Sequence, residues 1–158
     1  MIILYEENDD FNIRLNDDPV EVESIVDTFA DEEISHLVYD SDSYMDGWKD
    51  GVIQSFILYE DNEPASFLDF WISSYEDNLV STAVGTRADK RGRGYAKAIT
   101  QFAIDWAIKN LPEQGIDSID WLVKKDNIDS INIAKELGFE ILGDSTTDSE
   151  WQFYNYEL

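Results

Sequence analysis

The chain has 158 residues, of which 43% are hydrophobic and 13% aromatic, and its formal net charge is -24. This length and apolar content suit one folded domain, expected over residues 1–158, and exclude an intrinsically disordered chain. The sequence has no cysteine, so a thiol nucleophile, a thiolate metal site and a disulfide framework are excluded.

The apolar pattern and the charge predict location and partners. No apolar run approaches the ~18 residues of a membrane span, and the opening run is too short for a signal peptide, so we expect a cytoplasmic protein. The acidic excess would repel nucleic acid and anionic membranes. It would attract amines, polyamines or basic peptides, although acidity can equally serve solubility or adaptation to salt or low pH.

The first half of the chain combines helical and β-rich patterns. After the opening strands, capping residues predict a helix over about 19–30, and a second short helix is expected over about 31–39. Two β-rich runs, at 52–59 and 65–73, are separated by turn residues at 61–64. This arrangement predicts a β-hairpin.

The second half alternates strands and helices. A strand at 79–85 leads into a helix over 94–111, whose apolar residues recur with helical spacing. The next strand, at 119–123, can lie parallel to the strand at 79–85 through a right-handed crossover. The element order predicts one mixed body of strands and helices.

The last elements are marked by their end signals. Asp126 is expected to cap a helix over about 127–137, and Gly138 suits its left-handed terminator. Two closing strands follow, at 141–142 and 151–156. No internal repeat or interdomain linker separates them from the preceding elements.

One loop stands out by its charge. Five of the eleven Lys and Arg residues lie within residues 87–97 with a single aspartate, so this window carries about +4. The loop precedes a helix, whose first N-H groups and dipole stabilise an anion. Gly92 and Gly94 would let the backbone approach the ligand, and Arg91 and Arg93 could add charge-assisted hydrogen bonds. We therefore predict an anion site, with phosphate as the expected anion.

Two common phosphate loops do not fit this segment. A Walker loop requires GxxxxGK followed by Ser or Thr, and a dinucleotide loop requires a third glycine where Lys97 stands. Residues 91–96, RGRGYA, instead resemble the acyl-coenzyme A loop of the GNAT family of N-acetyltransferases. Residues 127–139, NIDSINIAKELGF, resemble a later motif of that family, in the form seen in ribosomal-protein N-terminal acetyltransferases. The two motifs and the matching element order cover about residues 50–145.

The resemblance implies a fold and a cofactor. The implied fold class is α/β (α+β), with a mixed, mostly antiparallel sheet of about six or seven strands, about four flanking helices and a splayed parallel strand pair. Acetyl-CoA is the implied co-substrate, and no metal is expected. Its diphosphate would lie on the amides of residues 92–96. Its pantetheine arm would lie between the parallel strands, held by backbone N-H groups around residues 84–86. The residues implied to bind it are Val84, Gly85, Thr86, Arg91, Gly92, Arg93, Gly94, Tyr95, Ala96, Asn127 and Ser130.

At two positions that carry catalytic groups in other members of that family, this sequence has a different residue. Attack of an amine on a thioester requires loss of the ammonium proton, and so calls for a carboxylate or a water chain leading to one. Val80 stands where histone-type members carry a glutamate base, so Asp69 is our first candidate base and Glu76 our second. Either could instead be an ordinary solvated carboxylate. Ala134 stands where many members carry the tyrosine that protonates the thiolate, which leaves the acid unassigned.

Several aromatic and polar side chains have two interpretations. His36, the only histidine, lies in the segment that would cover the substrate, although a lone helix histidine is more often structural. Tyr44, Trp48 and Trp71 could line an acceptor pocket or serve only as packing. Tyr95 is expected to pack against the sheet.

The predicted function is acetyl-CoA-dependent N-acetyl transfer by direct attack. The acceptor would be a primary amine of a cationic small molecule or of a basic peptide or protein N-terminus. The alternative is a catalytically weak acyl-CoA-binding sensor or interaction module, suggested by the missing glutamate and tyrosine. Nucleic-acid binding is disfavoured because the charge of the whole chain outweighs the loop. We expect no nucleic-acid or membrane partner, and a monomer or homodimer.

Overall fold

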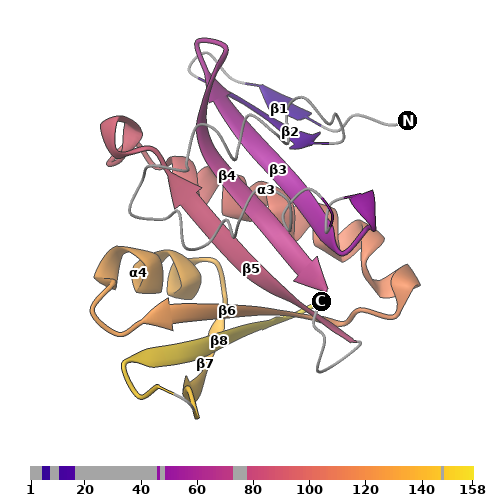
Figure 1. The fold of residues 1–158 in the computed structure, drawn as a ribbon, viewed down its shortest axis with the longest axis vertical. Helices are drawn as coiled ribbons and strands as arrows, with labels where there is room; N and C mark the ends of the chain where they lie inside the picture. The colour runs from indigo at the N-terminus through magenta and orange to yellow at the C-terminus, as the bar shows by residue number, and fades with distance from the viewer. Residues whose placement is uncertain (1–4, 8–10, 17–45, 47–48, 73–77, 147) are drawn as a thin grey trace. The chain divides into compact units, whose positions relative to one another are not determined.

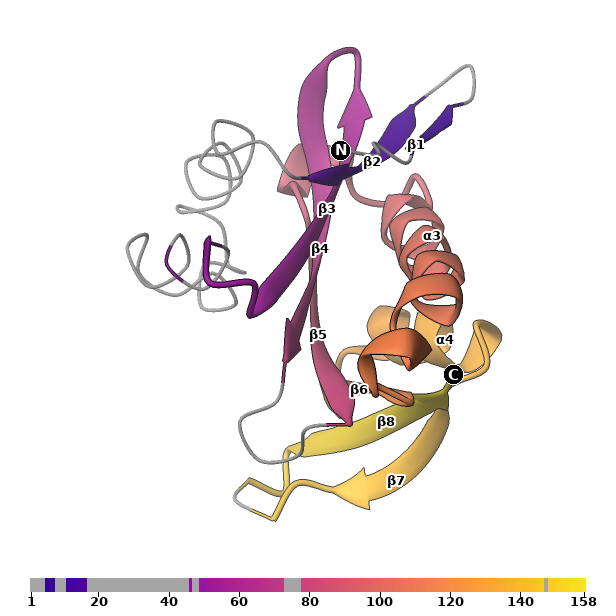
Figure 2. The ribbon, with the colours of Figure 1, turned by 90° about the vertical axis from the view of Figure 1, so that its right-hand side faces the viewer.

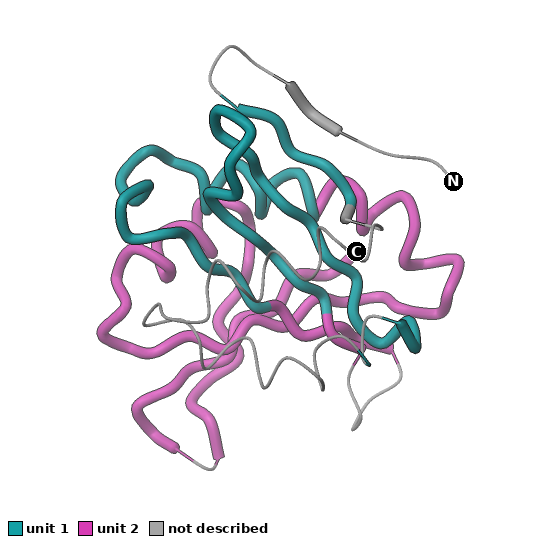
Figure 3. Tube along the Cα trace, turned by 45° about the horizontal axis from the view of Figure 1, so that its top comes forward, with its two compact units in different colours: residues 1–70, 83–103 teal, residues 71–82, 104–158 magenta. Residues whose placement is uncertain are grey.

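The computed structural model describes residues 5–7, 11–16, 46, 49–72, 78–146 and 148–158. They fall into two compact units (Figure 3). The first unit lies within residues 1–70 and 83–103, and the second within 71–82 and 104–158. Strand β5 (Leu79–Thr86) and helix α3 (Tyr95–Asn110) each contribute residues to both units. The predicted helices at 19–30 and 31–39 lie outside the described residues.

The strands follow the order β1-β2-β3-β4-β5-β6-β8-β7 in a mixed, mostly antiparallel sheet (Figure 1). Their bounds are Tyr5–Glu7, Asn12–Asn16, Ile53–Glu60, Glu63–Ile72, Leu79–Thr86, Ser118–Lys124, Glu140–Asp144 and Trp151–Glu157 for β1 to β8. The sheet type is confirmed, with eight strands where six or seven were expected. Two α-helices are described from end to end, α3 and α4 (Ile128–Glu136), and no described helix is long and apolar enough to cross a membrane.

Strands β3 and β4 are joined by a two-residue turn. Asp61 and Asn62 have φ values of 52° and 64°. A type I′ hairpin turn requires positive φ at both central residues, and Asp and Asn tolerate that conformation. The turn was predicted to extend to Pro64, but Glu63 and Pro64 already belong to β4. A two-residue turn is favoured here because its backbone twist matches the twist of the two strands that it joins.

The core of the first unit lies between the sheet and the first half of α3, which runs along one face of β3 and β4 (Figure 2). Phe56 of β3 packs edge to face against Phe70 of β4 and Phe102 of α3, with ring centroids 5.7 and 5.9 Å apart. Side chains alternate between the faces of a strand, so Asp69 belongs to the sheet face opposite α3.

The second unit contains the predicted parallel strand pair. Residues 79–82 of β5 pair in parallel with residues 118–121 of β6, which confirms the parallel arrangement. Strand β8 pairs antiparallel with both β6 and β7. Phe139 packs between Trp121 of β6 and Tyr156 of β8, with ring centroids 5.5 and 5.4 Å away. These three rings form an aromatic cluster in this unit.

Helix α4 follows β6, and its first turn corrects one prediction. Its N-cap is Asn127, whose Oδ1 accepts a hydrogen bond from the Ser130 amide at 3.2 Å. Asp126 was the predicted cap. An N-cap side chain accepts from the amide two or three residues further on, and Asn127 stands three residues before Ser130. Gly138 has a φ of 98°, which confirms it as the left-handed residue after the helix.

Candidate functional site

The cationic loop connects β5 to α3 within the first unit. A short 3-10 turn at Ala88–Lys90 follows the strand, and the next four residues are exposed. Gly92 and Gly94 have φ values of 79° and 80°, which glycine adopts without strain. A Cβ added at either glycine would meet no atom within 4 Å. The backbone at both glycines is therefore accessible to a ligand.

Helix α3 begins at Tyr95, directly after the second glycine. Its first intrahelical hydrogen bond runs from the Ala98 amide to the Gly94 carbonyl at 3.0 Å, so the preceding first-turn amides lack intrahelical partners. Such amides and the helix dipole stabilise an anion. Residues 92–96, which were predicted to bind the diphosphate, thus form one segment that combines two glycines with a helix N-terminus.

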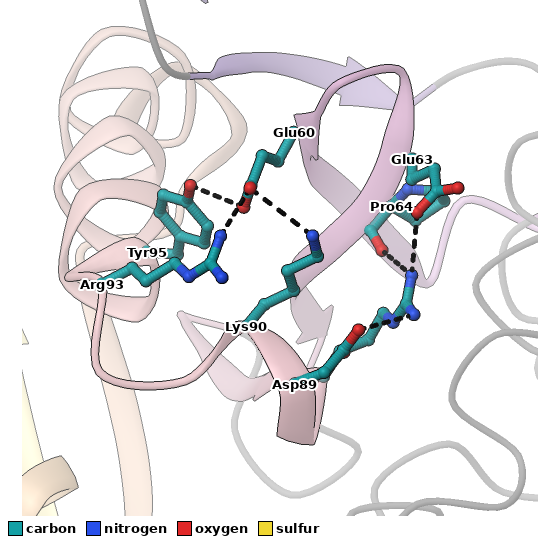
Figure 4. Close-up of polar contacts among 8 residues, drawn as sticks. Glu60, Glu63, Pro64, Asp89, Lys90, Arg93 and Tyr95 are labelled. Atoms are coloured by element: carbon teal, nitrogen blue, oxygen red, sulfur yellow. Dashed lines mark hydrogen bonds and ion pairs between the residues drawn. The ribbon is translucent and has the colours of Figure 1, made fainter.

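A carboxylate that no sequence motif indicated lies beside this loop. Glu60, the last residue of β3, accepts hydrogen bonds from Arg93 Nη1 at 2.5 Å, Tyr95 Oη at 2.7 Å and Lys90 Nζ at 3.4 Å (Figure 4). The Glu60 side chain is 12% exposed. Its donors lie 30 to 35 residues further along the chain, so no local pattern indicated the contact.

These contacts shift pKa values within the cluster. The hydrogen bond from Tyr95 lowers the pKa of Glu60, and Arg93 and Lys90 lower it further, against the opposing effect of desolvation. Burial raises the pKa of Tyr95, and its hydrogen bond to Glu60 adds to that rise. Glu60 is therefore an ionised acceptor at neutral pH, and Tyr95 is a protonated donor.

Other cations of the loop contact nearby oxygens. Arg91 donates from Nε to the Thr86 carbonyl at 3.1 Å. Arg87 contacts Asp89 at 3.0 Å and Glu63 at 3.6 Å. The local positive charge is thus partly balanced by carboxylates of the first unit. Contacts of a phosphate with the loop amides and with the arginines both stay predictions.

The end of β5 carries the residues predicted to bind the pantetheine arm. Buried Ser66 of β4 donates from Oγ to the Gly85 carbonyl at 2.8 Å and lies 3.0 Å from the Thr86 hydroxyl. Strand β4 thereby fixes the backbone of β5 immediately before the cationic loop. Contact of Val84, Gly85 and Thr86 with a cofactor stays a prediction.

The first candidate base is not a solvated surface group. Asp69 in β4 is fully buried, with 0% of the residue exposed. Full burial is rare for an aspartate, because removing a carboxylate from water is costly. The second candidate, Glu76, lies outside the described residues, as do His36, Tyr44 and Trp48.

The residues of the second motif lie in the second unit. Asn127 is exposed and uses Oδ1 to cap α4, so a hydrogen bond to a cofactor would come from its Nδ2 group. Ser130 is half-buried. Val80 and Ala134, which replace the glutamate and tyrosine of other family members, are both buried.

Known proteins show the same fold. The model of the Acetyltransferase (GNAT) family matches residues 20–139. No curated protein sequence matches the chain. The ribosomal-protein-S5-alanine acetyltransferase from Vibrio fischeri has a TM-score of 0.74 and 16% identity, over 98% of this chain and 96% of that one. The spermidine N-acetyltransferase from Vibrio cholerae, solved with CoA and spermine, has a TM-score of 0.75 and 14% identity, over 95% of this chain and 96% of that one.

A third similar structure is a ribosomal L7/L12 alpha-N-protein acetyltransferase in complex with CoA. Its TM-score is 0.73 at 14% identity, over 99% of this chain and 98% of that one. Identities this low show the shared fold, whereas the family model matches well over half of the sequence. Together they confirm the family that the two motifs predicted. The chain therefore belongs to the acetyltransferase (GNAT) family.

Proposed function

We propose that this protein transfers an acetyl group from acetyl-CoA to a primary amine. The observation that carries the proposal is the exposed turn at Gly92 and Gly94, which leads directly into the N-terminus of α3. That segment offers consecutive amides and open space to a diphosphate. Residues 92–96 of the first unit would hold the diphosphate, whereas contact of Asn127 and Ser130 with the cofactor stays a prediction from the sequence motif.

The acceptor we propose is cationic, either a small polyamine-like molecule or the N-terminus of a basic peptide or protein. The net charge of -24 would raise the local concentration of such molecules. Two of the similar structures are a spermidine N-acetyltransferase, solved with CoA and spermine, and a ribosomal-protein-S5-alanine acetyltransferase, which supports a polyamine or a protein as the acceptor. We further propose a cytoplasmic monomer or homodimer.

The proposed reaction is direct attack. A base first removes a proton from the ammonium group, and the neutral amine then forms a bond to the thioester carbonyl carbon. The carbon-sulfur bond breaks, the nitrogen gives up its second proton to the departing thiolate or to solvent, and CoA leaves beside the neutral amide. We assign the base to Asp69, because it is a carboxylate on β4, the strand next to β5, and a carboxylate can accept the ammonium proton. Amides at Val84 to Thr86 would stabilise the oxyanion.

A second candidate function is binding without turnover. The buried apolar residues Val80 and Ala134 stand where other family members carry an acid or base. A protein that retains the cofactor site without efficient proton transfer would serve as an acyl-CoA sensor or interaction module.

Two measurements test these functions in sequence. Thermal unfolding with CoA at about 100 times its Kd should show about 2.7 kcal/mol of added stability. Release of free thiol from acetyl-CoA is then followed over spermidine, small monoamines and peptides with basic N-termini. Binding with turnover supports the transferase, and binding without turnover on any acceptor supports the sensor. Failure to bind CoA would refute both.

A further inference from the structure

Three side chains of the loop that we propose to bind the diphosphate contact one carboxylate of the sheet. Lys90 precedes the two glycines, Arg93 lies between them, and Tyr95 follows them. All three side chains reach the carboxylate of Glu60 at the end of β3 (Figure 4). A single side chain therefore connects the start, the middle and the end of the turn to a strand of the same unit.

Of the three donors to Glu60, Tyr95 is the most buried. Tyr95 is buried, and its ring packs edge to face on Phe11, with centroids 5.4 Å apart. Its hydroxyl then points to Glu60 at 2.7 Å. The first residue of α3 is thus held by an aromatic contact and by a charge-assisted hydrogen bond. The hydrogen bond fixes the helix N-terminus relative to β3, and the ring contact fixes it relative to the residue that precedes β2 (Asn12–Asn16).

We propose that Glu60 is a positioning residue that holds the cationic loop in the conformation that receives the diphosphate. The inference rests on the proposed function, and it assigns the shape of the loop to a residue outside both family motifs. Glu60 does not itself touch the ligand. Its role is to order the turn with two glycines before the ligand binds, so that binding does not carry the entropy cost of ordering it.

The charge of Glu60 and its positioning role have opposite expected effects on CoA binding, so an experiment can distinguish them. Removing one negative charge beside an anion site should by itself strengthen anion binding. If Glu60 only neutralised the arginines, its removal would tighten CoA binding. If Glu60 positions the loop, its removal weakens binding in spite of the charge.

The experiment compares Glu60→Ala with the control Glu63→Ala in the full chain. Glu63 lies three residues away, its side chain is 65% exposed, and it contacts Arg87 outside the three-donor cluster. The two variants lose the same charge in the same region. We expect the Kd for CoA, measured by calorimetry, to be about tenfold higher for Glu60→Ala than for Glu63→Ala, equivalent to about 1.4 kcal/mol.

A second readout needs no ligand. Trypsin cleaves after Arg91 and Arg93 only when the loop opens locally. Mass spectrometry should therefore show cleavage at these two bonds about tenfold faster in Glu60→Ala than in Glu63→Ala. Glu60→Gln keeps an acceptor for Tyr95 and should fall between the two. This milder variant also provides the comparison if Glu60→Ala does not fold.

The outcomes separate this inference from the proposed function. If the wild type binds CoA but Glu60→Ala and Glu60→Gln match Glu63→Ala in Kd and in cleavage rate, Glu60 has no positioning role. Tighter CoA binding in Glu60→Ala would likewise overturn the inference and leave the proposed function intact. If the wild type binds no CoA, the proposed function fails and this inference fails with it.

Discussion

Replacing Gly94 with alanine should separate backbone strain from ligand binding. Gly94 has a φ of 80°, and an added Cβ would meet nothing within 4 Å, so the protein itself provides no steric obstacle. The remaining cost is that of placing an L-residue in the left-handed region, roughly 1–2 kcal/mol. In a chain of this size, that cost lowers the Tm by about 2–8 °C.

Gly51 offers a matched control for this substitution. It has a φ of 74°, and its Cβ would also meet nothing within 4 Å. Gly51→Ala and Gly94→Ala should therefore destabilise the protein by similar amounts. Only Gly94→Ala places a methyl group in the space that the diphosphate is proposed to occupy. If the two variants lose the same stability but only Gly94→Ala binds CoA more weakly, the weaker binding is due to the methyl group in the diphosphate site and not to backbone strain.

The assay is thermal unfolding with and without CoA at one fixed concentration. At 100 times the wild-type Kd, CoA adds about 2.7 kcal/mol of stability to the wild type and to Gly51→Ala. A tenfold rise in Kd would reduce this to about 1.4 kcal/mol in Gly94→Ala. If Gly94→Ala retained the full stabilisation by CoA, the assignment of the diphosphate to this turn would be refuted.

Three further results are expected. Asn127→Ala should lower stability by about 1 kcal/mol in denaturant unfolding, whereas Asn127→Asp should retain the cap; equal losses would exclude capping by Oδ1. Asp69→Asn should lower kcat and leave the Kd for CoA unchanged, and an unaltered kcat would remove Asp69 as the base. Folding lowers the pKa of Glu60 below its ordinary value of 4.5. Ionised Glu60 therefore stabilises the folded protein above pH 4.5, and this stabilisation is lost as the pH falls through the lower pKa of the folded state. The stability difference between wild type and Glu60→Gln should therefore shrink on acidification below that pH, and a constant difference would contradict the assignment.

The sequence predicted the elements around the loop because their signals are local. The helical spacing from 94 to 111 corresponds to α3, and the two glycines lie where the strand gives way to the helix. The two-residue turn at Asp61 was misjudged because Pro64 is compatible with both a turn and a strand start. Such errors move a boundary by a few residues and leave the topology unchanged.

The contacts that shape the site could not be read from sequence. Glu60 reaches donors at least 30 residues away, and only the pairing of distant elements brings them together. Asp69 was placed on a strand by pattern, yet its complete burial depends on everything that packs against β4. Periodicity reports which side of an element faces the core. It does not report which distant side chain arrives there.

Strand β7 has a consequence for how this protein behaves at high concentration. It is the last strand in the order, it is five residues long, and it exposes Ile141 and Leu142. Its register shifts between Ile141 and Gly143, and an irregularity of this kind bends a strand away from a straight template. Glu140 and Asp144 place acidic residues at its two ends. An apolar border strand that is short, bent and acidic at both ends resists stacking with other copies into fibrils.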